Sequence, residues 1–254
     1  MTSNVEDAPS SQFLSWLSII AIGTTVCLFL AGLEICWRIR SQGTTNGISS
    51  APFHTGFLSG QLWLQYGLLK HDKVVVFVNL VAALLYSLYI SYYFLMAPYG
   101  TKNRCIRLLF MEVIFLMSAY YYIHYYGLQV EVIHSRLGLC CVILNILTVA
   151  APLEALHEVF RTRCTETMPL PLCCLTFLVT TEWLLYGILI DDIYIKVEFF
   201  PTKVDFVNHC PEDKVVRYKK LSIPNAIASV IAAVQLLPFL YFPRNKQKAT
   251  IIIS

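Results

Sequence analysis

Seven long apolar segments constrain the fold of this chain more than any other feature of its sequence. A helix needs about 20 mainly apolar residues to cross the hydrocarbon core of a bilayer, because it rises about 1.5 Å per residue. Such segments lie at residues 14–37, 52–69, 74–94, 106–126, 137–159, 169–190 and 221–242. The sequence therefore predicts an all-α integral membrane protein with seven transmembrane helices.

The composition agrees with a chain whose apolar surface faces lipid. Of its 254 residues, 57% are hydrophobic and 14% are charged, whereas ordinary soluble domains have about 45–50% and about 25%. The net charge of +3 is scattered without a dense basic block, so we expect no nucleic-acid partner. The nine cysteines form no C-x-x-C pair. We therefore interpret them as small core residues and predict no metal and no cofactor.

The lysine and arginine residues indicate an orientation, because short cytoplasmic loops carry the excess of positive charge. The connections on one side, together with the C-terminal tail, hold Arg38, Arg40, Lys102, Arg104, Arg107, Arg161, Arg163, Arg244, Lys246 and Lys248. The other side holds Lys70, Lys73 and Arg136, apart from six positive residues within 196–220. We therefore expect an N-terminus outside and a cytosolic C-terminus.

Two stretches of the chain repeat each other at an offset of 120 residues. Trp63-Leu-Gln-Tyr66-Gly67 corresponds to Trp183-Leu-Leu-Tyr186-Gly187, and Asp72 corresponds to Asp192. An apolar run with one asparagine follows each copy, containing Asn79 in the first and Asn225 in the second. A duplicated unit of this kind indicates that the two halves have the same structure.

The second copy is longer than the first by 26 residues between its tyrosine and its asparagine. The surplus lies in the polar segment 197–222, which also holds five of the six positive residues that conflict with the topology. We interpret this segment as an insertion. It is either an extracellular loop or a translated intron, and the sequence leaves both open.

Helices one to three and helices five to seven form the two copies, with helix four between them. Two three-helix units joined directly would have opposite orientations, whereas one intervening helix makes them parallel. We therefore predict two parallel triple-helix bundles, at 14–94 and 137–242, with the linker helix at 106–126 and a cytosolic tail at 243–254. Sites for small molecules lie near the midplane where such repeats meet.

The repeated motifs resemble both halves of a SWEET (MtN3/saliva) sugar transporter of the animal type. The first half has Pro52-Phe53, then LWLQYGLL and VN, and the second has APL, TETMP, EWLLYGIL and IPNAIA. The resemblance covers about residues 29–242. It implies bidirectional facilitated transport of mono- or disaccharides without a coupling ion, in the plasma membrane or, alternatively, in Golgi or vesicle membranes. Its partners would be a small sugar and the lipid bilayer, and a homo-oligomer is left open.

The resemblance also assigns roles to individual residues. The implied sugar-binding residues are Asn79, Asn225, Trp63 and Trp183. Tyr66, Tyr186 and Asp192 match the extracellular gate of the family. Pro52, Pro152 and Pro169 match three of its four helix-bending prolines, and Gly32 occupies the fourth position.

Uncharged amides and aromatic rings suit such a substrate. A sugar hydroxyl both donates and accepts hydrogen bonds, and an asparagine amide offers both kinds of partner without charge. A lone asparagine in a membrane helix more often bonds to a neighbouring helix, and a tryptophan more often anchors an interface. The repetition of both residue types favours a shared cavity.

Ionisable residues inside membrane segments indicate function by default, and Glu34, Glu112, Glu182, His54 and His124 have such positions. The repeat does not duplicate them, so we expect structural pairs across the bundle rather than a proton relay. Asp72 lies at the end of a segment, where a solvated loop charge is the ordinary interpretation.

Other classes of protein fit less well. A seven-helix receptor would show no internal repeat, and an intramembrane enzyme would need paired catalytic groups that the spans lack. A lysosomal amino-acid transporter of the PQ-loop type would share the two bundles, but the Pro-Gln dipeptide is absent. A family member that has lost transport also stays open.

Overall fold

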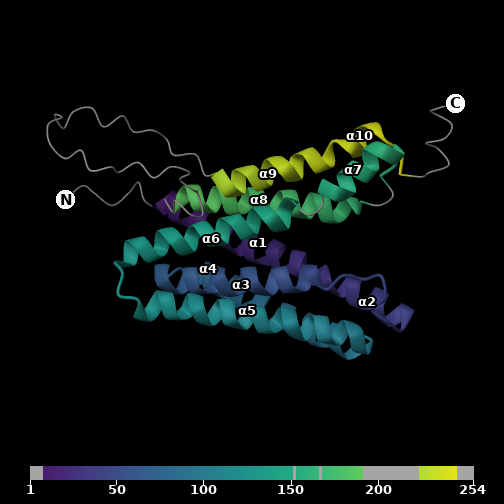
Figure 1. Ribbon diagram of the computed structural model, residues 1–254. Coiled ribbons are helices and arrows are strands. Elements are labelled where there is room, and N and C mark those ends of the chain that lie inside the picture. The colour runs from purple at the N-terminus through teal and green to yellow at the C-terminus, as the bar shows by residue number, and fades with distance from the viewer. Residues whose placement is uncertain (1–7, 151–152, 166–167, 191–222, 245–254) are drawn as a thin grey trace, which may run out of the picture.

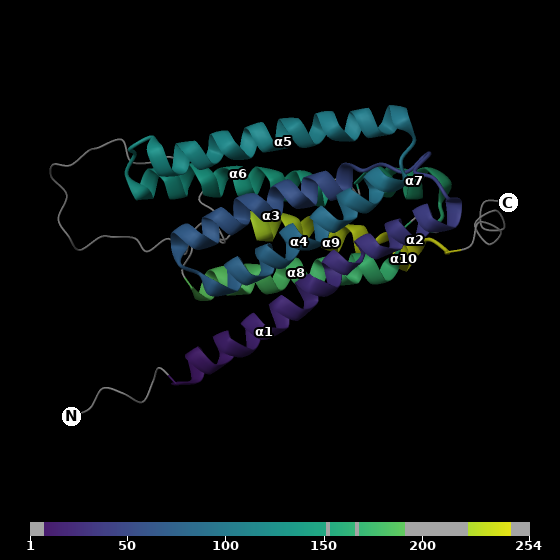
Figure 2. The ribbon, with the colours of Figure 1, turned by 90° about the horizontal axis from the view of Figure 1, so that it is seen from below.

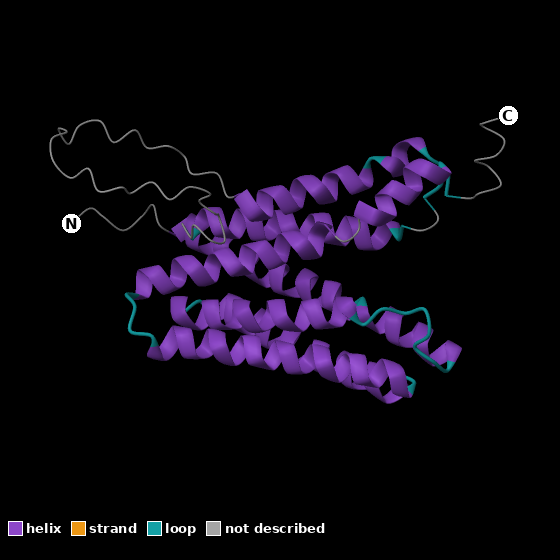
Figure 3. Ribbon diagram, in the orientation of Figure 1, coloured by secondary structure: helices purple, strands orange, loops and turns teal. Residues whose placement is uncertain are grey.

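The computed structural model describes residues 8–150, 153–165, 168–190 and 223–244. Within these ranges all regular structure is helical (Figures 1 and 3). The helices are α1 (Ala8–Leu30), α2 (Gly32–Gln42), α3 (Ala51–Lys70), α4 (Lys73–Met96), α5 (Tyr99–Tyr125), α6 (Val130–Ala150), α7 (Leu153–Thr162), α8 (Leu170–Leu189), α9 (Ile223–Leu236) and α10 (Pro238–Tyr241).

Each of the seven predicted segments coincides with one helix or with a broken pair of helices. Five are long and apolar enough to cross a membrane by length and composition: Gln12–Gln42, Lys73–Met96, Tyr99–Tyr125, Val130–Thr148 and Leu170–Leu189. The α3 segment has enough length but is not among these five, and it buries the polar residue His54 inside the protein. The described part of the last segment is shorter. The chain is an all-α integral membrane protein, as predicted.

Two of the predicted helices are interrupted: the first beside Gly32, which the resemblance had matched to a helix-bending position, and the last at a place that the sequence analysis did not predict. The first is interrupted at Ala31, between α1 and α2, where the amides of Ala31 and Glu34 bond three residues back instead of four. The last is interrupted at Leu237, before Pro238. Proline has no amide hydrogen and its ring crowds the preceding turn, which explains the second break.

The helices assemble into two bundles of three segments joined by α5 (Figures 1 and 2). In the first bundle, α4 packs against α1, α2 and α3; in the second, α9 packs against α6, α8 and α10. The linker helix α5 lies against α3 and α4 of the first bundle. The bundles meet mainly through α1 with α8 and α3 with α6.

A hydrogen-bonded pair of a histidine and a carboxylate holds α5 against the first bundle. His54 Nδ1 on α3 lies 3.1 Å from both carboxylate oxygens of Glu112 on α5. The His54 side chain is 5% exposed and that of Glu112 is 11% exposed. A buried polar group is tolerated when it is hydrogen-bonded, so these two residues have the structural role that we expected.

The apolar core differs between the two ends of the molecule. At the end that carries Asp72, one cluster includes Leu17, Leu62, Tyr66, Leu137 and Tyr186 and so joins both bundles. At the opposite end, which carries Arg104, two separate clusters are present. One is built from α2, α3, α4 and α5 around Phe53 and Tyr89, and the other surrounds Val159 in the second bundle. The bundles are therefore packed together at the Asp72 end.

Gly67 permits the tight turn between α3 and α4 at the Asp72 end. A Cβ atom added there would lie 3.0 Å from the backbone nitrogen of Val76 and 3.0 Å from Cγ1 of Val75. We expect Gly67→Ala to lower the free energy of unfolding by about 1–3 kcal/mol, because overpacking forces backbone to move. Gly23→Ala is the matched control, since nothing lies within 4 Å of its added Cβ. Thermal unfolding in detergent measures both, and equal midpoints would contradict the packing argument.

Candidate functional site

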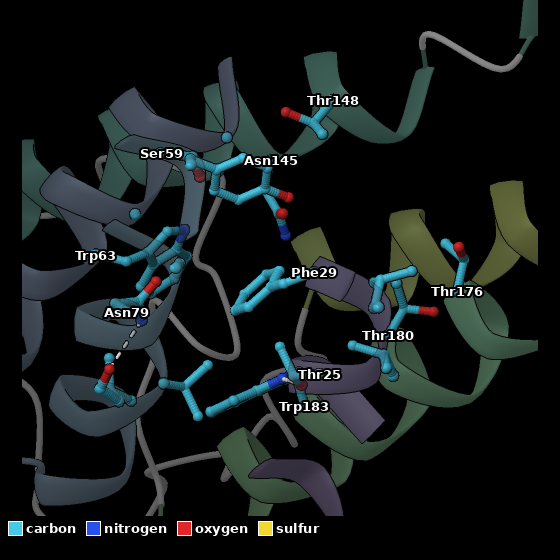
Figure 4. Close-up of a pocket in the computed structure, with 18 of the residues that line it drawn as sticks. Thr25, Phe29, Ser59, Trp63, Asn79, Asn145, Thr148, Thr176, Thr180 and Trp183 are labelled. Carbon is cyan, nitrogen blue, oxygen red and sulfur yellow. Dashed lines mark hydrogen bonds between the residues drawn. The ribbon is translucent and has the colours of Figure 1, made fainter. Parts of the chain in front are cut away.

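A cavity of about 330 Å³ lies between the two bundles, near the middle of the helices (Figure 4). Both bundles contribute to its wall. From the first come Thr25, Leu28, Phe29, Gly56, Ser59, Gly60, Trp63, Val75, Val78, Asn79, Ala82 and Tyr86, and from the second Asn145, Thr148, Leu172, Thr176, Val179, Thr180, Trp183 and Asn225. A cavity of this size and position is where small-molecule sites of helical bundles occur.

The four residues for which we predicted a binding role, Trp63, Asn79, Trp183 and Asn225, all line this one cavity. The two asparagines differ in their partners. Asn79 Nδ2 donates to the carbonyl oxygen of Val75, one turn earlier in α4, at 2.9 Å. Asn225 Oδ1 accepts from Asn145 Nδ2 on α6 at 3.5 Å. The amides are thus held in place by helix contacts while they line the cavity.

The two tryptophans have nearly the same setting in the two bundles. Trp63 meets the ring of Tyr66 edge-on, with centroids 5.5 Å apart and planes at 78°. Trp183 meets Tyr186 at 5.4 Å and 79°. The indole nitrogen of Trp183 also donates to the hydroxyl of Thr25 on α1, at 2.9 Å. The repeat seen in the sequence is therefore a repeat of side-chain geometry at the cavity.

The same offset of 120 residues relates several lining residues that the sequence analysis missed. These pairs are Thr25 with Asn145, Gly56 with Thr176 and Gly60 with Thr180. Each pair occupies equivalent helices of the two bundles. The signal was present in the sequence, because applying the offset beyond the motif would have identified them.

The two bundles differ at two of these equivalent positions, where the first bundle has glycine and the second has threonine. A Cβ atom at Gly56 would lie 2.4 Å from the ring of Tyr86, and one at Gly60 would lie 3.1 Å from Cβ of Ala82. Close packing of α3 on α4 therefore excludes larger residues in the first bundle. In the second, Thr176 and Thr180 donate their hydroxyl protons to backbone carbonyls and keep oxygen lone pairs as acceptors.

Within the described part of the chain, no Asp, Glu, Lys, Arg or His lines this cavity. Its polar groups are amides, hydroxyls and indole N–H groups. Such a set is suited to a neutral molecule with several hydrogen-bonding groups, and aromatic rings are suited to an apolar face. The described residues also contain no group of three His, Cys, Asp or Glu side chains that could hold a metal.

Glu182 is buried beside the cavity but is not part of its wall. It is 5% exposed, and its Oε2 accepts the hydroxyl proton of Thr24 on α1. Glu182 and the His54–Glu112 pair therefore make the structural contacts that we expected of ionisable residues. Glu34 and His124 are exposed instead.

A hydrogen bond joins the two bundles at the Asp72 end of the molecule. The hydroxyl of Tyr186, on α8, lies 3.0 Å and 3.1 Å from the two carboxylate oxygens of Asp72. Asp72 also caps α4, because its Oδ1 accepts from the amides of Val74 and Val75. The interpretation of Asp72 as a solvated loop charge is therefore wrong, since the side chain is half-buried and paired across the molecule.

The other residues of the predicted gate and hinges have varied settings. Tyr66 is fully buried next to this bridge. Pro52 lies in the first turn of α3, and Pro169 directly precedes α8, so both stand at the beginning of a helix. Asp192 and Pro152 lie outside the described residues.

Comparison with known proteins identifies the family. The family model MtN3_slv, described as a sugar efflux transporter for intercellular exchange, matches residues 15–101 and 135–202. Sugar transporter SWEET1 of Caenorhabditis elegans is 34% identical over 237 residues, which cover 93% of this chain and 68% of the relative. The chain belongs to the SWEET sugar-transporter family.

Further SWEET proteins support the same assignment. SWEET1 of Drosophila pseudoobscura pseudoobscura is 34% identical, covering 72% of this chain and 81% of the relative. The bidirectional sugar transporter N3 of Medicago truncatula is 29% identical, covering 87% and 74%. The fold matches a solved eukaryotic SWEET transporter with a TM-score of 0.74 at 22% identity, over 90% of this chain and 95% of that one. The resemblance inferred from the motifs is confirmed.

The hydroxyl of Tyr186 provides a direct test of the bridge in this SWEET protein. We expect Tyr186→Phe to lower the free energy of unfolding by about 1.5–3 kcal/mol, the usual value of a hydrogen bond to a charged group. Tyr121→Phe is the control, because Tyr121 is 61% exposed on α5. Unfolding by SDS titration in mixed micelles measures both variants. Equal stability of the two would show that the bridge does not hold the bundles together.

Proposed function

We propose that the protein carries mono- or disaccharides across a membrane in both directions, down their gradient, by alternating access. The observation that supports this most is the uncharged cavity between two bundles that, among the described residues, share one apolar cluster at the Asp72 end. Its amides and hydroxyls suit sugar hydroxyls, and its aromatic rings suit the C–H face of a sugar ring. The family assignment agrees with sugar as the cargo.

Asn79 and Asn225 are the residues that we propose to bind the sugar hydroxyls. Each lines the cavity from one bundle, so a single sugar would contact both halves of the protein at once. Trp63 and Trp183 would flank the ring from the side of the Asp72 end. Because the site has no charge, it would release its substrate readily, as a facilitator must.

Rocking of the bundles would expose the site alternately to the two sides. The gate at the Asp72 end would consist of Tyr66, Tyr186 and Asp192, and we add Asp72 to it because of its bond to Tyr186. Breaking this bridge would let that end open while the opposite end closes.

The proposed hinges are Gly32, Pro52, Pro152 and Pro169. At Gly32 there is a steric reason for the lack of a side chain, because a Cβ atom there would lie 2.4 Å from the ring of Tyr89 on α4. The absence of a side chain allows the α1–α2 break to pack against α4. A larger residue would push this break away from the bundle.

The distribution of positive residues supports an orientation with the Asp72 end outside and the Arg104 end in the cytosol. The structure then corresponds to a transporter closed to the outside. We propose the plasma membrane as its location, with residues 14–94 and 137–242 as the two moving units and 106–126 as their linker.

Counterflow in liposomes tests the proposed transport. Purified protein is reconstituted with glucose, fructose, galactose, sucrose or trehalose inside, and uptake of the same labelled sugar is measured. We expect flux in both directions that ignores a collapsed proton gradient. Flux that follows pH would contradict uniport and would implicate Glu182. Absence of sugar flux together with amino-acid flux would favour a lysosomal type of transporter, and absence of both would indicate an inactive family member.

The amide pair provides the sharpest test of the site. We expect Asn79→Ala and Asn225→Ala each to lower the initial rate of sugar uptake at least about tenfold, because each loses hydrogen bonds made inside a water-poor cavity. Asn103→Ala is the control, since Asn103 is exposed on α5. Uptake is normalised to the amount of protein in the membrane. Unchanged rates in both cavity variants would place the site elsewhere.

A further inference from the structure

A second cavity lies at the Arg104 end and has a different chemical character. Its volume is about 430 Å³, and it lies between the α2–α3 loop and the beginning of α5. No residue lines both this cavity and the central one. The side chains in its wall that carry nitrogen or oxygen are those of Thr45, Asn46, Ser49, Ser50, Tyr93, Thr101 and Arg104. Hydroxyl groups and one guanidinium therefore dominate its polar surface.

Arg104 gives the cavity a positive charge that no neighbouring acid in its wall neutralises. It is the one charged residue among the described residues that line the cavity. Arg104 and Thr101 belong to the first two turns of α5, which begins at Tyr99 without a side-chain cap. The beginning of a helix carries a partial positive charge. Both contributions favour an anion.

Thr45 supplies an independent indication of a ligand. It is 3% exposed and lines the cavity, and its hydroxyl oxygen is buried without a hydrogen-bond partner among the described residues. A buried hydroxyl without a partner is destabilising, so a bound acceptor would satisfy it. Ser50, the N-cap residue of α3, likewise makes no capping bond with its side chain.

The cavity is held in shape by the core beneath it. Ile48 is buried in the apolar cluster of the first bundle, and its carbonyl oxygen accepts from the hydroxyl of Tyr93 at 2.8 Å. Cys105 also lines the cavity, and its sulfur lies 3.6 Å from Nε2 of His54. Because His54 is fixed by Glu112, this wall is preorganised, which lowers the entropic cost of binding.

The positive phi angles of Gly43 and Gly47, 68° and 73°, give the loop its curvature. Residues with a Cβ atom disfavour positive phi angles, whereas glycine adopts them without a steric penalty. The loop therefore turns back toward α5 and presents its hydroxyl groups on the same side as Arg104. Local sequence and core packing together build a concave donor surface.

We propose that this cavity binds a phosphate group, carried either by the headgroup of an anionic phospholipid or by a free phosphate ester. The guanidinium of Arg104 can bind two phosphate oxygens at once, and the hydroxyls of Thr45, Ser50 and Thr101 can donate to the others. A bound phosphate would connect the α2–α3 loop to α5. This loop directly precedes Pro52, so occupancy of the site would restrict movement at the start of α3.

Binding to the purified full-length chain in neutral detergent tests the proposal. The probes are short-chain phosphatidic acid, glycerol 3-phosphate and, as a zwitterionic reference, short-chain phosphatidylcholine. Binding is followed by the thermal unfolding midpoint as each probe is titrated. The variants are Arg104→Gln and Thr45→Val, with Arg107→Gln as the matched control, because Arg107 is exposed on the same helix but does not line the cavity.

We expect saturable binding of a phosphate probe and an increase in its Kd of at least about tenfold in Arg104→Gln, the usual effect of losing a charged hydrogen bond. Thr45→Val should also weaken binding, and Arg107→Gln should not. Binding of phosphatidic acid alone would identify a lipid headgroup as the source, and equal binding of glycerol 3-phosphate would identify a free ester. No saturable binding of either phosphate probe, or equal weakening by Arg104→Gln and Arg107→Gln, would overturn the proposal.

Discussion

The hydrogen bond between Tyr186 and Asp72 lies where the two bundles are held together, and the rest of the architecture depends on this attachment. Around it, one apolar cluster draws residues from both bundles. At the opposite end each bundle keeps its own cluster. A molecule joined in this way holds its two bundles together beside the tryptophans of the central cavity. Because a hydrogen bond to a charged group is strong yet breakable, the same contact can hold one state and still permit another.

The hydrocarbon environment explains why the polar groups of the protein lie where they do. Polar side chains inside a bilayer are costly unless they face protein or water. Here the asparagines, threonines and tryptophans converge on the cavity between the bundles, while the His54–Glu112 pair is buried between α3 and α5. The wall of the central cavity carries no charge among the described residues, whereas the second cavity carries Arg104. Two cavities of different chemical character thus lie in the middle and at one end of the same molecule.

The duplication made much of the central site predictable. Trp63, Trp183, Asn79 and Asn225 were identified because the same motif occurs twice, and all four line the cavity. The offset also relates Thr25 to Asn145, but these residues lie outside the short motif and were missed. Asp72 was misinterpreted for a different reason. Its partner Tyr186 is 114 residues away in sequence, and nothing local distinguishes a capping carboxylate from one that also bridges two bundles.

The sequence by itself determined the membrane-spanning helical class, the duplicated three-helix unit and the chemical type of the central residues, because apolar length and repetition are local properties of the chain. Only the tertiary structure decided at which end the bundles are joined, that the last helix breaks at Leu237, and that Thr45, Arg104 and Cys105 line one cavity. These features depend on packing between segments that are distant in sequence. The pattern of residues along the chain does not specify which segments pack together, since the same apolar face can pack against more than one neighbour.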